Sequence, residues 1–345
     1  MRILAIDIGA GTQDILLYDS ERAIENCTSL VLPTPSVVFA KKLLDMHGEV
    51  YIYGDTVGGG PLAAAILEHI QRGYRVAMDE SAAYSIRNDL EEVRSMGILV
   101  RKDPEFKSLH EMEIREIDLA PLFKFLSNFG EEPDVNAIAI AVQDHGVAPP
   151  GISDRIFRFK KLEEMLQQNN TPESFHFLNY EVPDYYLRMR SAVRAAKRTV
   201  SLPVVTMDTA FSAILGCLDE GAGPSLIVNV GNGHTIAALV LEKKIEGVYE
   251  HHTHELTSGK LEDELQRFVR GELSTHQVYE ENGHGVITLK PFFGEISVRV
   301  TGPNRNLFKD TSMKYTFASP AGNTMMTGPL GLVKATLYRL RNSDT

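Results

Sequence analysis

Residues 6–18, IDIGAGTQDILLY, and residues 228–240, VNVGNGHTIAALV, repeat one arrangement of residues at two distant places in the chain. Each copy opens with an apolar stretch that carries a polar residue, Asp7 or Asn229. Two glycines one residue apart follow, then a hydroxyl residue and a second apolar stretch. Such a pattern predicts two β-hairpins, each with a glycine-rich turn. The glycines are Gly9, Gly11, Gly231 and Gly233, and the hydroxyl residues are Thr12 and Thr235.

The glycine-rich turns point to a ligand that carries phosphate groups. Glycine tolerates positive φ and lets backbone N–H groups approach a ligand closely, as they do in anion-binding nests. Two such hairpins that face each other would clamp a polyphosphate. A dinucleotide-binding Rossmann turn is a competing interpretation, but it needs a third glycine and a helix directly after the turn, and TQDILLYD provides neither. An ordinary tight hairpin is the other alternative, and the second copy makes it less favourable.

Length and composition indicate a folded protein of two domains. The 345 residues are 43% hydrophobic, and 46 acids against 35 bases leave a net charge of −11. We expect no nucleic-acid partner, because the basic run RMRSAVRAAKR at residues 188–198 is typical of a solvated helix face. We also expect no membrane partner and a soluble, cytoplasmic protein, because no apolar run approaches ~18 residues and the N-terminus does not resemble a signal peptide.

Cysteine usage excludes several kinds of cofactor. Cys27 and Cys217 are the two cysteines of the sequence, and they form no CxxC motif. They cannot by themselves supply a structural zinc site or hold an iron–sulfur cluster. The clustered cysteine triplet that radical chemistry needs is therefore absent, and we do not expect a radical iron–sulfur activating enzyme.

Strands and helices alternate along the chain, which predicts an α/β architecture. Residues 29–33, SLVLP, and 36–40, SVVFA, are expected to be strands. The second half has the order strand, strand, strand, helix, strand, helix, which mirrors a βββαβα unit. Further elements are expected as helices at 61–72, 81–96 and 208–218 and from residue 327 onward, and as a buried strand at 136–142. Asp208 is a good N-cap for the helix at 208–218.

Three segments resemble the actin-like ATPase superfamily, which includes actin, sugar kinases and the heat-shock chaperone ATPases. IDIGAGTQD resembles its first phosphate motif, and residues 207–233, MDTAFSAILGCLDEGAGPSLIVNVGNG, resemble its crossing helix and second phosphate motif. Residues 319–335, SPAGNTMMTGPLGLVKA, are similar in position to the adenosine-contacting turn that opens the final helix. The resemblance implies a two-domain actin-like (ribonuclease H-like) ATPase fold, with duplicated βββαβα units around a nucleotide cleft.

The resemblance also implies domain limits and ligands. Residues 1–207 would form the first domain, with an insertion at about 41–130, and residues 208–345 would form the crossing helix, the second domain and the last helix. ATP and Mg²⁺ would lie between the domains, and Asp7 would hold the Mg²⁺ through water. The residues implied to contact the nucleotide are Gly9, Gly11, Thr12, Asn229, Gly231, Gly233, Thr235, Gly322 and Gly328.

The second copy departs from the superfamily's pattern. An aspartate usually stands where this chain has Asn229, and an amide cannot take a proton at neutral pH, so a base role does not carry over. We expect the base elsewhere, first at Asp144 and next at His145, which follow a buried strand where α/β sheets place their clefts. A capped turn is the alternative there. Gln13 is expected to position a water, as glutamine does in other nucleotide hydrolases.

Two further segments are candidate sites. Residues 54–61, GDTVGGGP, place glycines at a predicted helix N-terminus, where backbone amides favour an anion. Residues 250–255, EHHTHE, put His252 and His254 on one face of a strand, where they and an acid would suit a divalent metal. A tight turn and exposed histidines are the respective alternatives.

These patterns predict an ATP-binding protein that acts as an Mg²⁺-dependent phosphotransferase or ATP hydrolase on an unknown small-molecule or protein phosphate acceptor. One alternative is a non-enzymatic nucleotide-dependent switch or scaffold, which Asn229 favours. Another is a metal-dependent enzyme that uses the histidine cluster at residues 251–254. The chain also resembles a prokaryotic branch of the superfamily that has sometimes carried a pyruvate formate-lyase-activating label, and the missing cysteine cluster argues against that label.

Overall fold

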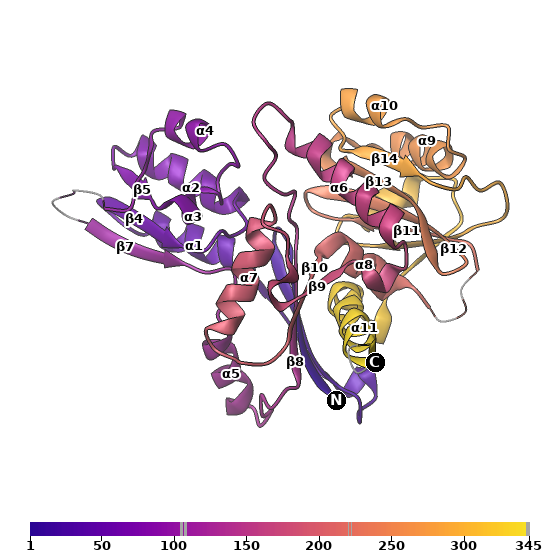
Figure 1. The fold of residues 1–345 in the computed structure, drawn as a ribbon, viewed down its shortest axis with the longest axis horizontal. Coiled ribbons are helices and arrows are strands. Elements are labelled where there is room, and N and C mark those ends of the chain that lie inside the picture. The colour runs from indigo at the N-terminus through magenta and orange to yellow at the C-terminus, as the bar shows by residue number, and fades with distance from the viewer. Residues whose placement is uncertain (104–105, 107–108, 220, 222, 343–345) are drawn as a thin grey trace.

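The computed structural model describes residues 1–103, 106, 109–219, 221 and 223–342, and its described strands form three sheets (Figure 1). The first sheet contains β1 (Arg2–Ile8), β2 (Thr12–Asp19), β3 (Thr28–Pro33), β8 (Ala137–Val142), β9 (His176–Leu178) and β10 (Val204–Asp208). Its strand order is β3-β2-β1-β8-β10-β9. The first three strands form an antiparallel meander, and β8 and β10 run parallel to β1.

The second sheet repeats this topology. It contains β11 (Ser225–Val230), β12 (His234–Leu241), β13 (Lys244–His252), β14 (Gly285–Thr288), β15 (Ser297–Thr301) and β16 (Tyr315–Phe317). Its order is β14-β13-β12-β11-β15-β16, so an antiparallel meander is again followed by parallel strands beside its first strand. The repeated order confirms the duplicated α/β units of the two-domain actin-like fold that the sequence predicted.

Two helices, α8 (Thr209–Cys217) and α11 (Thr327–Asn342), lie between these sheets (Figure 1). They confirm the helices predicted at 208–218 and from residue 327. A single hydrophobic core joins both sheets through them. Its members include Ile3, Ala139, Ile214, Ile227 and Leu332. The two α/β units therefore share buried apolar surface, which fixes the two glycine turns relative to each other.

A third, all-parallel sheet interrupts the first unit between β3 and β8. Its order is β6-β5-β4-β7, and it has its own core. The strands are β4 (Glu49–Gly54), β5 (Val76–Met78), β6 (Ile98–Val100) and β7 (Leu109–Ile114), accompanied by α1 (Pro35–Leu44), α2 (Gly60–Gln71), α3 (Glu80–Ala83) and α4 (Leu90–Ser95). These elements lie within residues 35–114, whereas the insertion was expected at 41–130. The domain limits at 207 and 208 stay a prediction.

Two predictions for this region were wrong. SVVFA is not a strand but part of α1, because Pro35 occupies the first helical turn and Ser36, Ala40 and Leu43 bury one face at helical spacing. The helix expected at 81–96 is two short helices, α3 and α4. The Asp89 side chain accepts a hydrogen bond from Glu91 N–H and so starts a new helix within that range.

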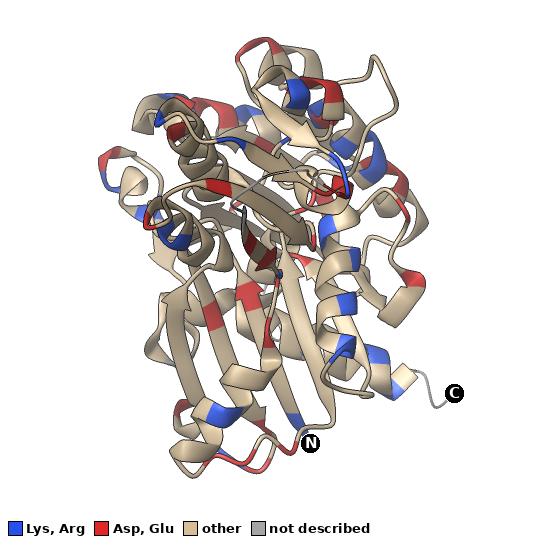
Figure 2. Cartoon of the chain, turned by 90° about the vertical axis from the view of Figure 1, so that its left-hand side faces the viewer, with Lys and Arg blue, Asp and Glu red and all other residues tan. Residues whose placement is uncertain are grey.

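The remaining elements cover the sheets and connect them. The helices are α5 (Leu119–Asn128), α6 (Asp154–Gln168), α7 (Leu187–Lys197), α9 (Ser258–Val269) and α10 (Thr275–Glu280). Short 3₁₀ helices occur at Ile24–Asn26, Pro172–Ser174, Asn179–Glu181, Thr253–Glu255, Arg305–Asp310, Pro320–Gly322 and Thr324–Met326. In Figure 2, ribbon segments of basic and acidic residues both occur over the side of the molecule that it presents. Among the described residues, no helix combines the length and apolar character needed to cross a bilayer.

Candidate functional site

A cleft of about 510 Å³ lies between the two six-stranded sheets, and both glycine turns line it. The start of α2, the segment after β8 and the start of α8 complete its walls. The structure brings together most of the residues predicted from the sequence, namely Asp7, Gly9, Gly11, Thr12, Asp144, His145, Asn229, Gly231 and Gly233. The predicted residues that do not line this cleft are Gln13, Thr235, Gly322 and Gly328.

The two glycine turns have the same backbone geometry. Gly9 N–H donates to Thr12 O, and Gly231 N–H donates to His234 O, each at 2.9 Å. The turns also face each other, because a Cβ added at Gly11 would lie 3.2 Å from the Asn232 side chain. The expectation of positive φ was wrong for all four glycines of these turns. Gly231 is needed for lack of space, because a Cβ added there would lie 2.7 Å from His234 O.

Asp7 lies at the floor of the cleft and is 8% exposed. Thr209 Oγ1 donates a 2.5 Å hydrogen bond to its Oδ1 atom. Gly328 packs directly on the other oxygen, because a Cβ added at Gly328 would lie 1.8 Å from Asp7 Oδ2. Burial raises the pKa of Asp7 to about 8. Gly328 therefore leaves room for the Asp7 carboxylate. Gly322 is exposed on a 3₁₀ turn.

Asp14 lies beside Asp7 and was not singled out from the sequence. The two residues are paired in the β1–β2 ladder and both line the cleft. Burial raises the pKa of Asp14 to about 6, and its Oδ1 atom is buried without a hydrogen-bond partner. Gln13 lies between Thr12 and Asp14, which both line the cleft. Neighbouring side chains of a strand point to opposite faces, so the Gln13 side chain points away from the cleft, and its Nε2 atom donates to Pro33 O. Strand alternation therefore brings Asp14 to the cleft in place of Gln13.

Asn229 occupies the place in β11 that corresponds to Asp7 in β1. Gly302, at the end of β15, approaches it closely, because a Cβ added there would lie 2.6 Å from Asn229 Oδ1. Gly302 has a φ of +95°, which also favours glycine. Thr235 is fully buried, and its hydroxyl is hydrogen-bonded to that of Thr253 at 3.0 Å. It therefore supports the second turn and is not exposed in the cleft.

Asp144 lines the cleft, but its carboxylate is occupied by backbone groups. Oδ2 accepts from the N–H groups of Arg188 and Met189 at 2.9 and 3.0 Å, and Oδ1 accepts from Gly146 N–H at 2.9 Å. The two bonds to Oδ2 satisfy backbone N–H groups in the first turn of α7, which have no partner within the helix. Burial raises the pKa of Asp144, although these backbone hydrogen bonds oppose that shift. The capped turn considered as the alternative is thus the geometry that Asp144 has.

A buried ion pair connects the third sheet with the cleft. Arg188 donates to Glu116 from Nε and Nη2 at 3.0 and 2.7 Å, and Glu116 accepts from Gly58 N–H at 3.1 Å. Glycine is required in this part of residues 54–61, because a Cβ added at Gly59 would lie 1.7 Å from Ser85 O. The segment does open a helix, α2, as predicted, and Gly58, Gly59 and Gly60 line the cleft. Arg188 brings a positive charge to that wall.

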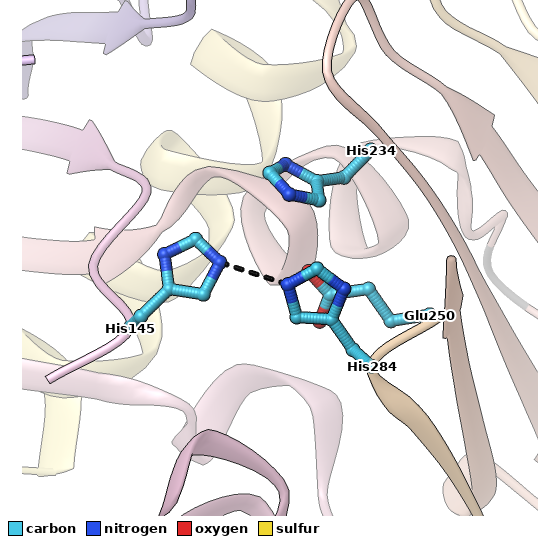
Figure 3. Close-up of side chains that lie close together, drawn as sticks. All are labelled: His145, His234, Glu250 and His284. Carbon is cyan, nitrogen blue, oxygen red and sulfur yellow. Dashed lines mark hydrogen bonds between the residues drawn. The ribbon is translucent and has the colours of Figure 1, made fainter. Parts of the chain in front are cut away.

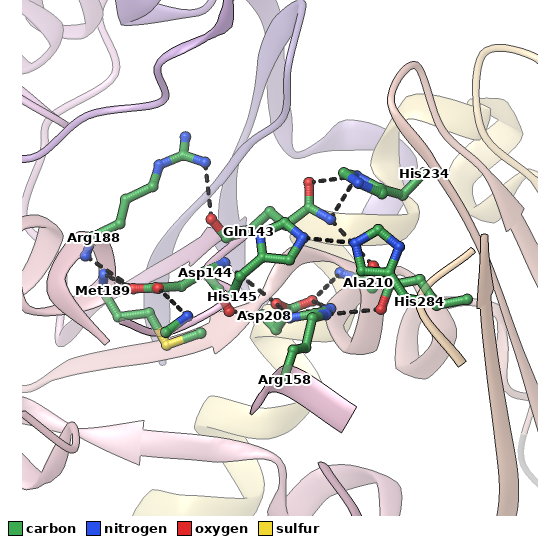
Figure 4. Close-up of polar contacts among 12 residues, drawn as sticks. Gln143, Asp144, His145, Arg158, Arg188, Met189, Asp208, Ala210, His234 and His284 are labelled. Atoms are coloured by element: carbon green, nitrogen blue, oxygen red, sulfur yellow. Dashed lines mark hydrogen bonds and ion pairs between the residues drawn. The ribbon is translucent and has the colours of Figure 1, made fainter. Parts of the chain in front are cut away.

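Arg158 of α6 is 1% exposed and joins the two α/β units (Figure 4). Its Nη1 atom lies 2.9 Å from Asp208 Oδ2, and its Nε atom lies 2.7 Å from Glu250 Oε2. Asp208 also caps α8 by accepting from Ala210 N–H, as the sequence predicted. Burial by itself would raise the pKa of Glu250, but Arg158 and the neighbouring imidazoles outweigh it and lower that pKa.

A group of histidines meets beside Glu250 (Figure 3). His145, His234, His284 and Glu250 each offer a ligand atom within 4.8 Å of the others. Burial lowers the pKa values of all three imidazoles, that of His234 to about 4. The rings of His252 and His254, expected on one face, do lie side by side with centroids 5.4 Å apart, but neither residue belongs to this group of possible ligands. His252 also stands beside His234 and His284, whereas His251 contacts Lys260.

One member of this group was predicted from the sequence, because His145 was a candidate base. His284, in the sequence GHG at residues 283–285, had no signal beyond a turn. A fold that brings the segment after β8 against the start of β14 was needed to identify it.

A family model with the description "Putative pyruvate format-lyase activating enzyme (DUF1786)" matches residues 57–307 of the chain. No curated protein matches it.

Several solved structures are similar to the chain over nearly its whole length. An inorganic polyphosphate/ATP-glucomannokinase from Arthrobacter sp. strain KM is 12% identical, with a TM-score of 0.40 and coverage of 99% of each chain. The PilM-PilN type IV pilus biogenesis complex gives 14% identity, a TM-score of 0.41 and coverage of 98% of each chain. The activator of 2-hydroxyisocaproyl-CoA dehydratase from Clostridium difficile gives 8% identity, a TM-score of 0.39 and coverage of 100% and 97%.

Proposed function

We propose that this chain, which belongs to the DUF1786 family, binds ATP with Mg²⁺ in the cleft and uses it for phosphoryl transfer or hydrolysis. The observation that carries the proposal is the pair of like glycine turns that face each other across one cleft. Each turn presents backbone N–H groups at the end of a hairpin, and two opposed turns can hold a chain of phosphates between them.

The size and surface of the cleft support a nucleotide ligand. Its volume of about 510 Å³ falls within the ~300–1,000 Å³ that is typical of small-molecule sites. A Cβ added at Gly233 would meet nothing within 4 Å, so a ligand has room to approach the backbone of the second turn. Apolar side chains such as Val57, Ile86 and Met325 also line the cleft and suit the flat face of a base.

The charge of the cleft supports a divalent cation as part of the ligand. The carboxylates in its lining are Asp7, Asp14, Asp144, Asp154 and Glu250, and the guanidinium groups are Arg87 and Arg188. A polyphosphate would meet net repulsion there without a cation. Asp7 would hold Mg²⁺, directly or through its waters. Bound there, Mg²⁺ would neutralise charge on the phosphate oxygens.

We assign the task of orienting the attacking water or acceptor hydroxyl to Asp14. It is a cleft carboxylate with an oxygen that has no partner in the described structure, whereas both oxygens of Asp144 accept backbone hydrogen bonds. Arg188 would steady the phosphates from the opposite wall, held in place by Glu116. The phosphate acceptor is a small molecule or a protein group that enters beside the third sheet, where residues 56–61 and 84–88 line the cleft.

A nucleotide-dependent switch is a second candidate, because two observations favour it. Asn229 replaces an acid in the second turn, and Asp144 is engaged as a helix cap. Both reduce the number of groups that could accept a proton. In contrast, the residues do not fit radical iron–sulfur chemistry, because the sequence has two cysteines and both are buried, one on each α/β unit.

Titration calorimetry with ATP, in the presence and absence of Mg²⁺, tests the proposal. We expect Mg²⁺-dependent binding by the wild-type chain and at least tenfold weaker binding by Asp7→Asn. Gln13→Asn is the matched control, because Gln13 lies on the opposite face of the same hairpin and should leave affinity unchanged. Absence of binding at millimolar MgATP would refute the nucleotide site.

Single-turnover measurement of ADP release then separates an enzyme from a switch. An enzyme should release ADP in a reaction that Asp14→Asn slows by about 10²–10⁴-fold, the usual contribution of a positioned acid or base. Nucleotide binding without ADP release, alone and with candidate acceptors, would favour the switch.

A further inference from the structure

Three histidines and a glutamate converge where the two α/β units meet. His145 follows β8 of the first unit, whereas His234, Glu250 and His284 come from β12, β13 and the start of β14 in the second. Figure 3 shows their side chains pointing toward one another across the junction. His284 and Glu250 are fully buried, and the other two line the edge of the cleft.

The separation of the ring nitrogens matches the spacing of metal ligands. His145 Nε2 and His284 Nε2 are 3.1 Å apart. A tetrahedral ion with metal–nitrogen bonds of about 2.0–2.1 Å places two ligand nitrogens about 3.3 Å apart. All four residues offer an atom within 4.8 Å of the others. Small movements of these side chains toward one ion would bring the four atoms to ligand distances. The described residues contain no second group of this kind.

One ring nitrogen of His284 lacks the partner that a purely structural histidine would have. Its Nδ1 atom is buried without a hydrogen-bond partner in the described structure, whereas its Nε2 atom is hydrogen-bonded to Nε2 of His145 at 3.1 Å. An unsatisfied buried polar group costs about 1–3 kcal/mol, so such an arrangement needs a compensating interaction. Ligation of a cation by the His284 ring would offset that cost.

The surrounding residues resemble the outer shell of a metal site. The Gln143 side-chain amide contacts Nδ1 of His234 at 2.8–3.0 Å, which leaves Nε2 of that ring to face the group. Arg158 holds Glu250 Oε2 at 2.7 Å, and Oε1 accepts a long hydrogen bond from the Gln143 amide at 3.5 Å. Partners of this kind orient ligands in known metal centres. Arg158 offsets one of the carboxylates of Asp208 and Glu250, so this buried group keeps a net negative charge that favours a cation.

We propose that His145, His234, His284 and Glu250 bind one divalent transition metal of the class that imidazole and carboxylate ligands favour, Zn²⁺ or Fe²⁺. The site is separate from the Mg²⁺ site proposed at Asp7, which has oxygen ligands alone. Because one ligand comes from the first unit and three from the second, the ion joins the two units at the edge of the cleft. The proposal does not depend on nucleotide binding.

Metal content and metal affinity of the tag-free full chain test the proposal. The protein is stripped with a chelator, dialysed, and titrated with Zn²⁺ in the absence of nucleotide. We expect one ion per chain, together with the visible absorption of a low-symmetry site when Co²⁺ replaces Zn²⁺. His145→Ala and His284→Ala should each weaken Zn²⁺ binding by more than about 100-fold. Gln143→Ala should weaken it by about 10–100-fold, as loss of an outer-shell partner does.

His254→Ala is the matched control, because His254 is exposed and lies a few residues from Glu250 without joining the group. It should bind Zn²⁺ like the wild type. His145 lies on a loop and is only partly buried, so His145→Ala remains informative if His284→Ala does not fold. Zn²⁺ binding that His145→Ala leaves unchanged, or absence of stoichiometric binding by the wild type, would overturn the proposal. MgATP titration of the same samples reports separately on the nucleotide site.

Discussion

Asp7 and Asp14 differ from ordinary surface acids in their burial and in their pKa values. They are paired across β1 and β2, both are 8% exposed, and both face the cleft. Burial raises the pKa of Asp7 to about 8 and that of Asp14 to about 6, because a desolvated carboxylate loses its hydration. Carboxylates in such surroundings weaken the folded state unless a ligand compensates them, which is typical of functional sites.

Asp14→Asn should stabilise the protein at neutral pH and have little effect near pH 4. The folded-state pKa of Asp14 is about 6 against an ordinary value of 3.8, so the folded state binds the proton more tightly. The stability linked to this proton is fully present below about pH 4 and is lost as the pH rises through about 6. After allowance for partial solvent access, we expect a gain of about 1–3 kcal/mol at pH 7.5.

Urea unfolding at several pH values, without Mg²⁺ or nucleotide, measures this effect. Asp134→Asn is the control, because Asp134 is exposed and lies outside the cleft. The wild type should lose more unfolding free energy than Asp14→Asn between pH 4 and pH 7.5. Equal losses in the two proteins would contradict a raised pKa of Asp14 in the folded state.

At the scale of elements, the crossing of α8 and α11 decides how the two sheets are placed. Glycines at the crossing let the helix backbones touch. A Cβ added at Gly216 would lie 1.7 Å from Thr327 O, and one added at Gly331 would lie 1.8 Å from Ser212 O. Ser212 Oγ also donates to Gly328 O at 2.6 Å. The close approach therefore depends on backbone atoms that cannot move aside without shifting a helix.

Gly331→Ala should destabilise the protein by about 1–3 kcal/mol or more, because the added methyl group meets a carbonyl oxygen at the helix crossing. Gly259→Ala is the matched control. Gly259 also lies in a helix, α9, and an added Cβ there would meet nothing within 4 Å. It should stabilise by up to about 1 kcal/mol, because alanine favours helices. Thermal unfolding of both variants checks the contrast, and equal midpoints would contradict it.

At the scale of the whole molecule, Arg158 links elements from both α/β units. It lies on α6, pairs with Asp208 at the start of α8 and with Glu250 on β13, and donates to Asp144 O at 3.0 Å. A buried ion pair is not by itself a sign of high stability, but the loss of one partner leaves uncompensated charges in the interior. The three-residue network therefore favours one relative placement of the two units.

Arg158→Met should destabilise the protein by about 3–5 kcal/mol, the usual effect of removing one partner from a buried ion pair. Methionine keeps much of the side-chain volume, so the change reports on charge rather than on a cavity. Arg94→Ala removes an exposed pair with Glu91 and should change stability by less than about 1 kcal/mol. Denaturant unfolding of both variants makes the comparison. A loss of similar size in both would show that burial of Arg158 has no special effect.

Local patterns in the sequence were sufficient for much of the fold. The two hairpins were predicted because apolar strands and glycine turns are encoded within a dozen residues, and α8 because Asp208 caps an apolar helix. SVVFA failed because a short apolar run does not distinguish a strand from a helix by itself. Gln13 was preferred over Asp14 because the face of a strand that meets the cleft is set by its neighbours rather than by its own residues.

The sequence by itself determined the duplication and the two glycine hairpins, because each hairpin depends on residues close together in the chain. The tertiary structure alone decided which side chains meet. Asp144 became a helix cap because α7 begins beside it, and His284 joined His145 and His234 because three strands and a loop converge there. Contacts between residues more than a hundred positions apart depend on how the two sheets close around α8 and α11, and no local pattern encodes that closure.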